Sequence, residues 1–420
     1  MRISTVTMFD QSVSAMNRQQ GDFMKVGQQI ASGRRVVNPS DDPQAASRAV
    51  GVSQAKAVTQ QFADARVSAR NTLSQAESVL NSVSDAITSA KTLLVQASSD
   101  TLNDADRQSV ASELRGIYET LIGQANATDG NGRYLFGGYQ DSSAPFVRNG
   151  TGVTYVGDDN ARAQRIDASR EMPVSDNGAR IFNSVASGAG YLTEAGKLDA
   201  NGVIAGGNGG SVTFSGPQVL DNSDPNHGRA FRVDFTSDTV THTYTVKMQD
   251  DSGAWVDTVP ALNDEAYDPA GQTIEVGGLR LELQGTPEDG DGVRFATADE
   301  MNHDLFKSLE KALNVLENPA ATPAEKAELR NTFRTSMNEL DNSLDNVLTV
   351  RASMGARLNE LDVVDAVSGN RMTNYEQTLS DLVDLDYSEA IAEYSLRQVG
   401  LQAAQKAFVD VKGLSLFNYL

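Results

Sequence analysis

Apolar residues recur at alternating steps of four and three in both end regions of the chain, the spacing of helices that bury one seam against a partner. Near the N-terminus the seam extends from position 9 to position 30, weakened by the polar Gln20 and the small Gly27. The segment ends at Ser32-Gly33, a sequence typical of a helix C-cap. The apolar residues that carry this seam are Phe9, Val13, Met16, Phe23 and Ile30.

A second, much longer helix is predicted from Pro43 to about Ala97. Asp42 suits the N-cap and Pro43 the first helical position. At about 1.5 Å per residue, this helix would be a rod of roughly 80 Å. A return helix from Asn103-Asp104 to about residue 129 is too short to cover it, so another helix must do so. The unbroken part of the rod's seam consists of Leu73, Ala76, Leu80, Val83, Ile87, Ala90, Leu94 and Ala97.

The C-terminal region supplies further helices. A short one is predicted over 301–317, and Thr322 and Pro323 mark the start of a long one whose seam extends to Leu382. We interpret the seams of 73–125 and 323–382 as an intrachain core. The last segment places apolar residues seven apart and continues to the terminus; those predicted to mediate subunit assembly are Leu401, Phe408, Val411, Leu414 and Leu416. Because 1–32 and 390–420 have few local partners, we expect both to order on assembly with neighbouring subunits.

The centre of the chain has a different composition. Most of the 35 glycines lie in 141–300, and strand-like segments occur at 133–138, 153–156, 230–235, 242–248 and 273–283, with glycine-rich breaks at 206–210 and 290–292. The sequence therefore predicts an α+β fold, a long antiparallel helical rod bundle with an inserted β-rich domain. The expected domains are 1–42 with 386–420 (terminal helices), 43–180 with 301–385 (rod and β-hairpin region) and 181–300 (outer β domain).

Composition excludes several kinds of chemistry. The net charge of −21 and the isoelectric point near 4.5 argue against nucleic-acid and anionic-membrane binding. There is no cysteine, and the three histidines (His227, His242 and His303) lack metal-ligand spacing. No apolar stretch is long enough to span a membrane, and the N-terminus lacks the apolar segment of a signal peptide. We therefore predict no enzyme activity, no cofactor and no metal.

Two further kinds of segment are weaker candidates for binding sites. The acidic stretches 221–224 and 288–291 could bind calcium, but they lack the twelve-residue ligand loop, and Asp and Gly are also the usual residues of tight turns. The glycine string at 206–210 lacks the Lys-Ser/Thr ending of a phosphate-binding loop.

Several motifs resemble the flagellin superfamily, and within it the hook-associated protein 3 family of hook–filament junction proteins. The turn 31–43 ends in Asp41, Asp42 and Pro43, where filament flagellins usually carry Asp-Asp-Ala-Ala-Gly. The opening 1–5 with Phe9, the segments 134–138 and 155–158, and the terminus 414–420 are also similar. The rod motif 354–359 adds Gly355, Arg357 and Asn359. The resemblance covers about 1–180 and 300–420.

The resemblance implies a structural protein of the extracellular flagellum, needed for filament assembly and swimming motility. Its terminal helices would be disordered in the free monomer. It would leave the cell through the flagellar type III apparatus without a cleaved signal, escorted by an export chaperone bound to its C-terminal helix. Copies of it would form a ring between the first hook-associated protein on the hook side and flagellin on the filament side. The alternatives are a filament flagellin, or a secreted enzyme, adhesin or other binding protein acting through 181–300.

Overall fold

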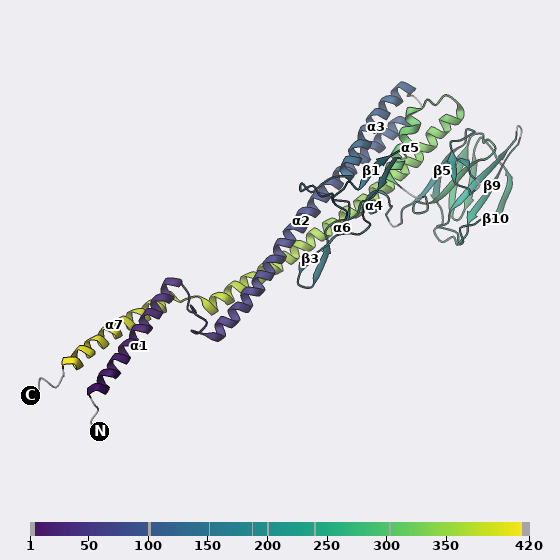
Figure 1. Ribbon diagram of the computed structural model, residues 1–420. Coiled ribbons are helices and arrows are strands. Elements are labelled where there is room, and N and C mark those ends of the chain that lie inside the picture. The colour runs from purple at the N-terminus through teal and green to yellow at the C-terminus, as the bar shows by residue number, and fades with distance from the viewer. Residues whose placement is uncertain are drawn as a thin grey trace, which may run out of the picture. The chain divides into compact units, whose positions relative to one another are not determined.

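The computed structural model describes residues 5–99, 102–150, 152–186, 188–199, 201–238, 241–301 and 304–413. The helices are α1 (Thr5–Ser32), α2 (Pro43–Ala97), α3 (Asp104–Ala125), α4 (Gly178–Phe182), α5 (Leu305–Glu317), α6 (Pro323–Val383) and α7 (Tyr387–Gly413). The strands are β1 (Phe146–Asn149), β2 (Gly152–Tyr155), β3 (Ala163–Asp167), β4 (Arg170–Pro173), β5 (Tyr191–Leu198), β6 (Ile204–Gly206), β7 (Thr213–Val219), β8 (Phe231–Ser237), β9 (His242–Gln249), β10 (Trp255–Ala266), β11 (Gln272–Val276), β12 (Leu279–Gln284) and β13 (Asp291–Thr297). The predicted α+β class is confirmed, with long helices from both ends of the chain and strands between them (Figure 1).

The chain divides into two compact units. The first comprises Met1–Arg66, Ile166–Ser169 and Asp362–Leu420, and the second comprises Val67–Arg165 and Arg170–Leu361. Both long helices, α2 and α6, pass from one unit into the other. These boundaries differ from the three domains expected from the sequence, which remain a prediction.

In the first unit, the start of α2 lies antiparallel to the end of α6. Lys56 Nζ lies 2.9 Å from Glu376 Oε1. Arg66 is only 1% exposed, and its guanidinium donates to the Asp365 carboxylate and, at 2.8 Å, to the backbone oxygen of Ile166. A buried guanidinium requires such partners because desolvation of an unpaired charge is costly. Arg66 thus joins α2, α6 and the tip of the β3–β4 hairpin.

In the second unit, α2 and α6 again lie antiparallel, and α3 and α5 pack beside them. Arg351 of α6 donates to Glu77 of α2 at 2.8 Å, and Arg115 of α3 forms an ion pair with Glu317 of α5. The predicted seam of α2 is buried throughout, with Leu73, Leu80 and Leu94 fully enclosed. The intrachain interpretation of this seam agrees with that burial.

Most predicted helix starts agree with the observed hydrogen bonds. Ala45 N donates to Asp42 Oδ1 at 3.0 Å, and Asn103 and Thr322 each form a capping box with the residue three positions on. One prediction was wrong: α5 starts at Leu305, not at residue 301. The reason is that Asp304 accepts from the Phe306 amide at 2.9 Å and so caps the helix there.

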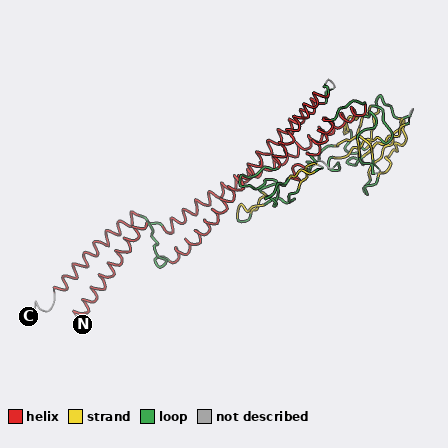
Figure 2. Tube along the Cα trace, turned by 45° about the horizontal axis from the view of Figure 1, so that its top comes forward, coloured by secondary structure: helices red, strands yellow, loops and turns green. Residues whose placement is uncertain are grey.

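The strands of the β-rich region form two sheets that share one core. The larger sheet has the order β10-β9-β8-β13-β5-β6 and the smaller one the order β11-β12-β7, and all neighbouring strands are antiparallel. Phe231 and Phe295 of the larger sheet and Phe214 and Leu281 of the smaller one lie in the same buried cluster. In Figure 2 these strands gather beside α5 and α6, within the second unit.

Two strand predictions were wrong. The segment 273–283 is not one strand but the hairpin β11–β12, because Gly277 and Gly278 adopt positive φ angles of 57° and 71° and form a two-residue turn. The segment 133–138 forms no regular strand. Its apolar residues are buried instead in an aromatic cluster, where the Phe136 ring lies 5.8 Å from the Phe182 ring.

Candidate assembly surface on the terminal helices

Helices α1 and α7 pair side by side in the first unit, antiparallel to one another (Figure 1). The Phe9 ring lies 5.2 Å from the Phe408 ring, and the Phe23 ring lies 4.6 Å from that of Tyr394. Because both helices advance by the same two heptads between these contacts, the register is regular and places Met16 opposite Leu401. The seven-residue spacing of Tyr394, Leu401 and Phe408 therefore matches the spacing of Phe9, Met16 and Phe23 on α1.

Gly27, one of the two weak positions in the N-terminal seam, faces Tyr394 of α7. A Cβ at Gly27 would lie 3.6 Å from the Tyr394 ring, an ordinary van der Waals distance, so an alanine would also fit here. Arg397 Nη1 of α7 also lies 3.1 Å from Asp22 Oδ2 of α1, at the edge of the pair.

The opposite face of α7 carries apolar side chains that α1 does not cover. Leu396 is 70% exposed and Val399 is 63% exposed. Ile391 and Val409 are also exposed, at positions between this face and the one that contacts α1. At 3.6 residues per turn, Leu396 and Val399 lie opposite the face formed by Tyr394, Leu401 and Phe408. A helix that is apolar on both sides is typical of one buried among several others.

The turn between α1 and α2 packs against the turn between α6 and α7. Gly33 ends α1 with a φ of 69°, as expected for a C-cap glycine. Its backbone oxygen accepts from Leu385 N at 3.1 Å, and Arg35 N donates to Val383 O at 2.7 Å. Asp41 Oδ2 accepts from the amide of Asn38 at 2.9 Å. The predicted turn motif thus holds the base of the terminal helix pair.

The two carboxylates of this turn, Asp41 and Asp42, should make the turn sensitive to acid. Hydrogen bonds from Asn38 and Ala45, respectively, hold the pKa of Asp41 and of Asp42 below the ordinary value. A carboxyl whose pKa is lowered in the folded state stabilises that state above its ordinary pKa, and this contribution is lost as the pH falls below it. We expect the amides of Asn38 and Ala45 to lose protection from hydrogen exchange, corrected for intrinsic rates, below about pH 4.

The Asp42→Asn variant is the matched control for this prediction. Asparagine is an equally good N-cap but does not titrate. Protection of the Ala45 amide should therefore persist in acid in the variant. Equal acid loss of that protection in the variant and the parent would contradict the assignment to Asp42.

The other predicted residues lie in several places. Val13, Met16, Ile30 and Leu401 are half-buried. Val411 belongs to α7, but its side chain lies outside the described residues, as do Leu414 and Leu416 altogether. Gly355, Arg357 and Asn359 lie on α6 in the second unit, so they do not join the turn motif. Arg357 instead donates to Asp176 Oδ2 at 2.6 Å and holds the segment that follows β4.

Sequence reasoning did not include the exposed face of α7 among the assembly residues. Its members are Leu396 and Val399. The available signal was the presence of apolar residues on the helix side opposite the 394–401–408 seam. The seven-residue repeat of Tyr394, Leu401 and Phe408 does not include these two residues.

Residues of the alternative chemical sites form hydrogen bonds within the protein. Asp291 is buried and accepts from the amides of Gly209 and Gly210, each at 2.8 Å, so these donors of the glycine string are already used. Asp221 Oδ1 accepts from Ser223 N at 2.8 Å, as in an ordinary Asx turn. Within the described residues, no three His, Cys, Asp or Glu side chains are grouped as metal ligands. None of the described helices is both long and apolar enough to cross a membrane.

Comparison with known proteins gives consistent relatives. Residues 3–141 match the bacterial flagellin N-terminal helical region. The chain is 33% identical to flagellar hook-associated protein 3 of Escherichia coli strain K12, over 100% of this chain and 99% of that protein. It is 32% identical to the protein of the same name from Salmonella typhimurium, with the same coverage.

Solved structures show the same fold. The crystal structure of FlgL from Xanthomonas campestris has 26% sequence identity and a TM-score of 0.63, covering 78% of this chain and 99% of that one. A flagellar hook-associated protein 3 from Legionella pneumophila has a TM-score of 0.65 at 23% identity, covering 79% of this chain and 98% of that one. Because the relatives from Escherichia coli and Salmonella typhimurium match over the full length of this chain, the chain belongs to the flagellar hook-associated protein 3 family.

Proposed function

We propose that the protein is the adaptor of the hook–filament junction, in which copies of it form a ring between the first hook-associated protein and flagellin. Its relatives are named as hook-associated proteins of the flagellum, which supports a structural role there. The function is then assembly, with no chemical step.

The observation that carries the proposal is that α7 has apolar residues on two opposite faces. One of its faces packs on α1, and the other exposes Leu396 and Val399. Complete burial of each such side chain would contribute roughly 1.5–3 kcal/mol. Neighbouring subunits that cover this face would therefore stabilise the terminal pair in the assembly.

We further propose that α1 and α7 fold when they assemble. A pair of helices buries only one side of each, so it has little apolar burial to offset the entropy of ordering its residues. A disordered terminal region also suits export of an unfolded chain through the type III apparatus. A chaperone bound to the C-terminal segment would cover the apolar side chains of α7 until assembly.

Charge distribution supports the same arrangement. The first 140 residues are neutral overall, whereas 141–300 carry a net charge of −14. Like charges close together in a dense assembly would repel one another. A neutral assembly region and an acidic region at the outside of the tube avoid that repulsion.

The test uses a strain that lacks the protein. Electron microscopy of this strain should show hooks without filaments, with flagellin lost to the medium, and the full-length gene should restore filaments and swimming. A Leu396→Asp, Val399→Asp variant should fail to restore them, because it places two charges on the face that we propose to be buried. Tyr394, Phe408 and their partners on α1 are left intact.

The matched control is Val219→Asp, Leu220→Asp, which changes two adjacent exposed apolar residues of the β-rich region. This variant should restore swimming as well as the parent does. Full motility with the α7 variant would contradict the proposed surface. Growth of the purified protein into long filaments by itself would instead favour a filament flagellin.

A further inference from the structure

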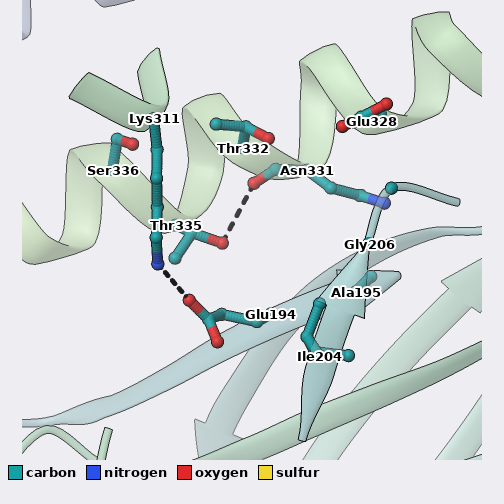
Figure 3. A pocket seen from close by; sticks show the side chains of 11 residues that line it. Glu194, Ala195, Ile204, Gly206, Lys311, Glu328, Asn331, Thr332, Thr335 and Ser336 are labelled. Atoms are coloured by element: carbon teal, nitrogen blue, oxygen red, sulfur yellow. Dashed lines mark hydrogen bonds and ion pairs between the residues drawn. The ribbon is translucent and has the colours of Figure 1, made fainter. Parts of the chain in front are cut away.

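Helix α6 carries a line of buried polar residues where it meets the β-rich region. Asn331 donates to Val212 O at 2.8 Å, Thr335 donates to Thr193 O at 2.6 Å, and Asn346 donates to Ile181 O at 3.0 Å. These side chains of α6 thus form hydrogen bonds to the backbone of three different segments of the chain. Figure 3 shows Asn331, Thr335 and Ser336 on α6, with the Thr335 side chain toward Glu194 of β5.

Glu339 lies in the same line but lacks a comparable partner. It is 4% exposed, and its Oε2 atom has no hydrogen-bond partner among the described residues. The ammonium of Lys311, on α5, is 3.9 Å from Glu339 Oε1, beyond hydrogen-bond distance. The same ammonium lies 2.5 Å from Glu194 Oε1 instead, the ion pair drawn in Figure 3. One cation is therefore shared unequally by two carboxylates.

Among the residues that the structure describes, the other groups around Glu339 do not supply a second cation. Asp304, the N-cap of α5, adds a third carboxyl group to the cluster. Ser308 also faces Glu339, but its hydroxyl donates to Asp304 O at 3.0 Å. A cavity of about 200 Å³ lies next to Lys311 and Glu194, between α5, α6 and β5. An ionised Glu339 would thus be buried in a cluster with more negative than positive charge.

We propose that Glu339 is a proton-operated lock on the contact between β5 and the helices α5 and α6. When Glu339 is protonated, Lys311 is left to Glu194 and the contact between β5 and the helices holds. When Glu339 is ionised, it competes for Lys311, and the contact opens more often. This property concerns the second unit alone and does not depend on how the terminal helices assemble.

The pH range follows from the surroundings of Glu339. Burial raises the pKa of Glu339 to about 7, against the opposing effects of Lys311 and Ser308, and Glu194 and Asp304 raise it further. The ordinary value, which applies when the contact is open, is 4.5. The closed state therefore binds more protons, and its added stability is complete below pH 4.5 and is lost as the pH rises through 7. The closed state should therefore lose most of this added stability between about pH 5 and about pH 8.

Hydrogen exchange of the full chain tests the proposal. Protection of peptides covering β5, corrected for intrinsic exchange rates, should fall about tenfold between about pH 6 and 8. In Glu339→Gln, which does not titrate, that fall should disappear. Asp345→Asn is the matched control, an exposed carboxylate on the same helix, and should behave as the parent. Identical pH profiles for the parent and Glu339→Gln would overturn the proposal.

A second variant covers the case in which Glu339→Gln does not fold. Because the charge of Glu194 raises the pKa of Glu339, the Glu194→Gln variant should move the midpoint of the parent's profile to lower pH. A midpoint that stays in place or moves to higher pH would also overturn the proposal.

Discussion

A chain carrying Phe23→Asp together with Phe408→Asp is expected to fail to enter the flagellum and to leave cells without filaments. The two rings pack on Tyr394 and Phe9, so the substitutions place charges near both ends of the α1–α7 seam. An unpaired carboxylate in an apolar contact costs several kcal/mol. The measurements are swimming in soft agar and electron microscopy of hooks from a complemented deletion strain.

The same variant should leave the second unit intact. Phe23 and Phe408 both belong to the first unit, so the thermal unfolding of the purified variant should keep the transition of the second unit unchanged. Val259→Asp, at a residue of β10 that is 86% exposed, is the matched control and should swim normally. Filaments of normal length on cells with the double variant would show that the helix pair is not the assembly element.

Phe306→Ala is expected to lower the free energy of unfolding of the second unit by about 3–5 kcal/mol. The Phe306 side chain has 0% exposure, and its ring lies 5.2 Å from that of Phe146 and 5.9 Å from that of Phe182. Tyr118 of α3 packs edge-on against it at 6.2 Å. Removal of the ring would leave a cavity where α3, α4, α5 and β1 meet, so the loss includes both apolar burial and packing.

Denaturant unfolding of the purified chain measures this loss as a lower midpoint for the second unit with an unchanged slope. Phe306→Leu, which fills most of the space, should lose clearly less than the alanine variant. A loss below about 1 kcal/mol for Phe306→Ala would mean that the site collapses around the smaller side chain. The aromatic cluster would then not be the main support of this junction.

The helices were predictable because their signals are local. A seam repeats every three or four residues, and a cap needs only a few neighbouring residues, so Asp42, Asn103 and Thr322 mark helix starts from the sequence alone. The terminal seams were predictable for the same reason. The spacing of Phe9 and Phe23 matches that of Tyr394 and Phe408, and this match requires no knowledge of the rest of the chain.

The β-rich region was predicted in part. Segments 230–235 and 242–248 alternate and lie in β8 and β9, but β5 was missed because its Glu194, Gly196 and Lys197 obscure the pattern. Its pairing with β13 depends on residues about a hundred positions away. Strand order and register are non-local properties of this kind, and alternation within one segment does not specify them.

By itself, the sequence determined the α+β class, the helix seams and caps, the neutral terminal region and the acidic centre, since each depends on composition or on neighbours within a few residues. Only the tertiary structure decided which polar residues are buried. Arg66 meets Asp365 and Ile166, and Glu339 meets Lys311, across long stretches of chain. The energetic cost of a buried charge depends on the partners that the fold brings to it, and a linear pattern does not contain those partners.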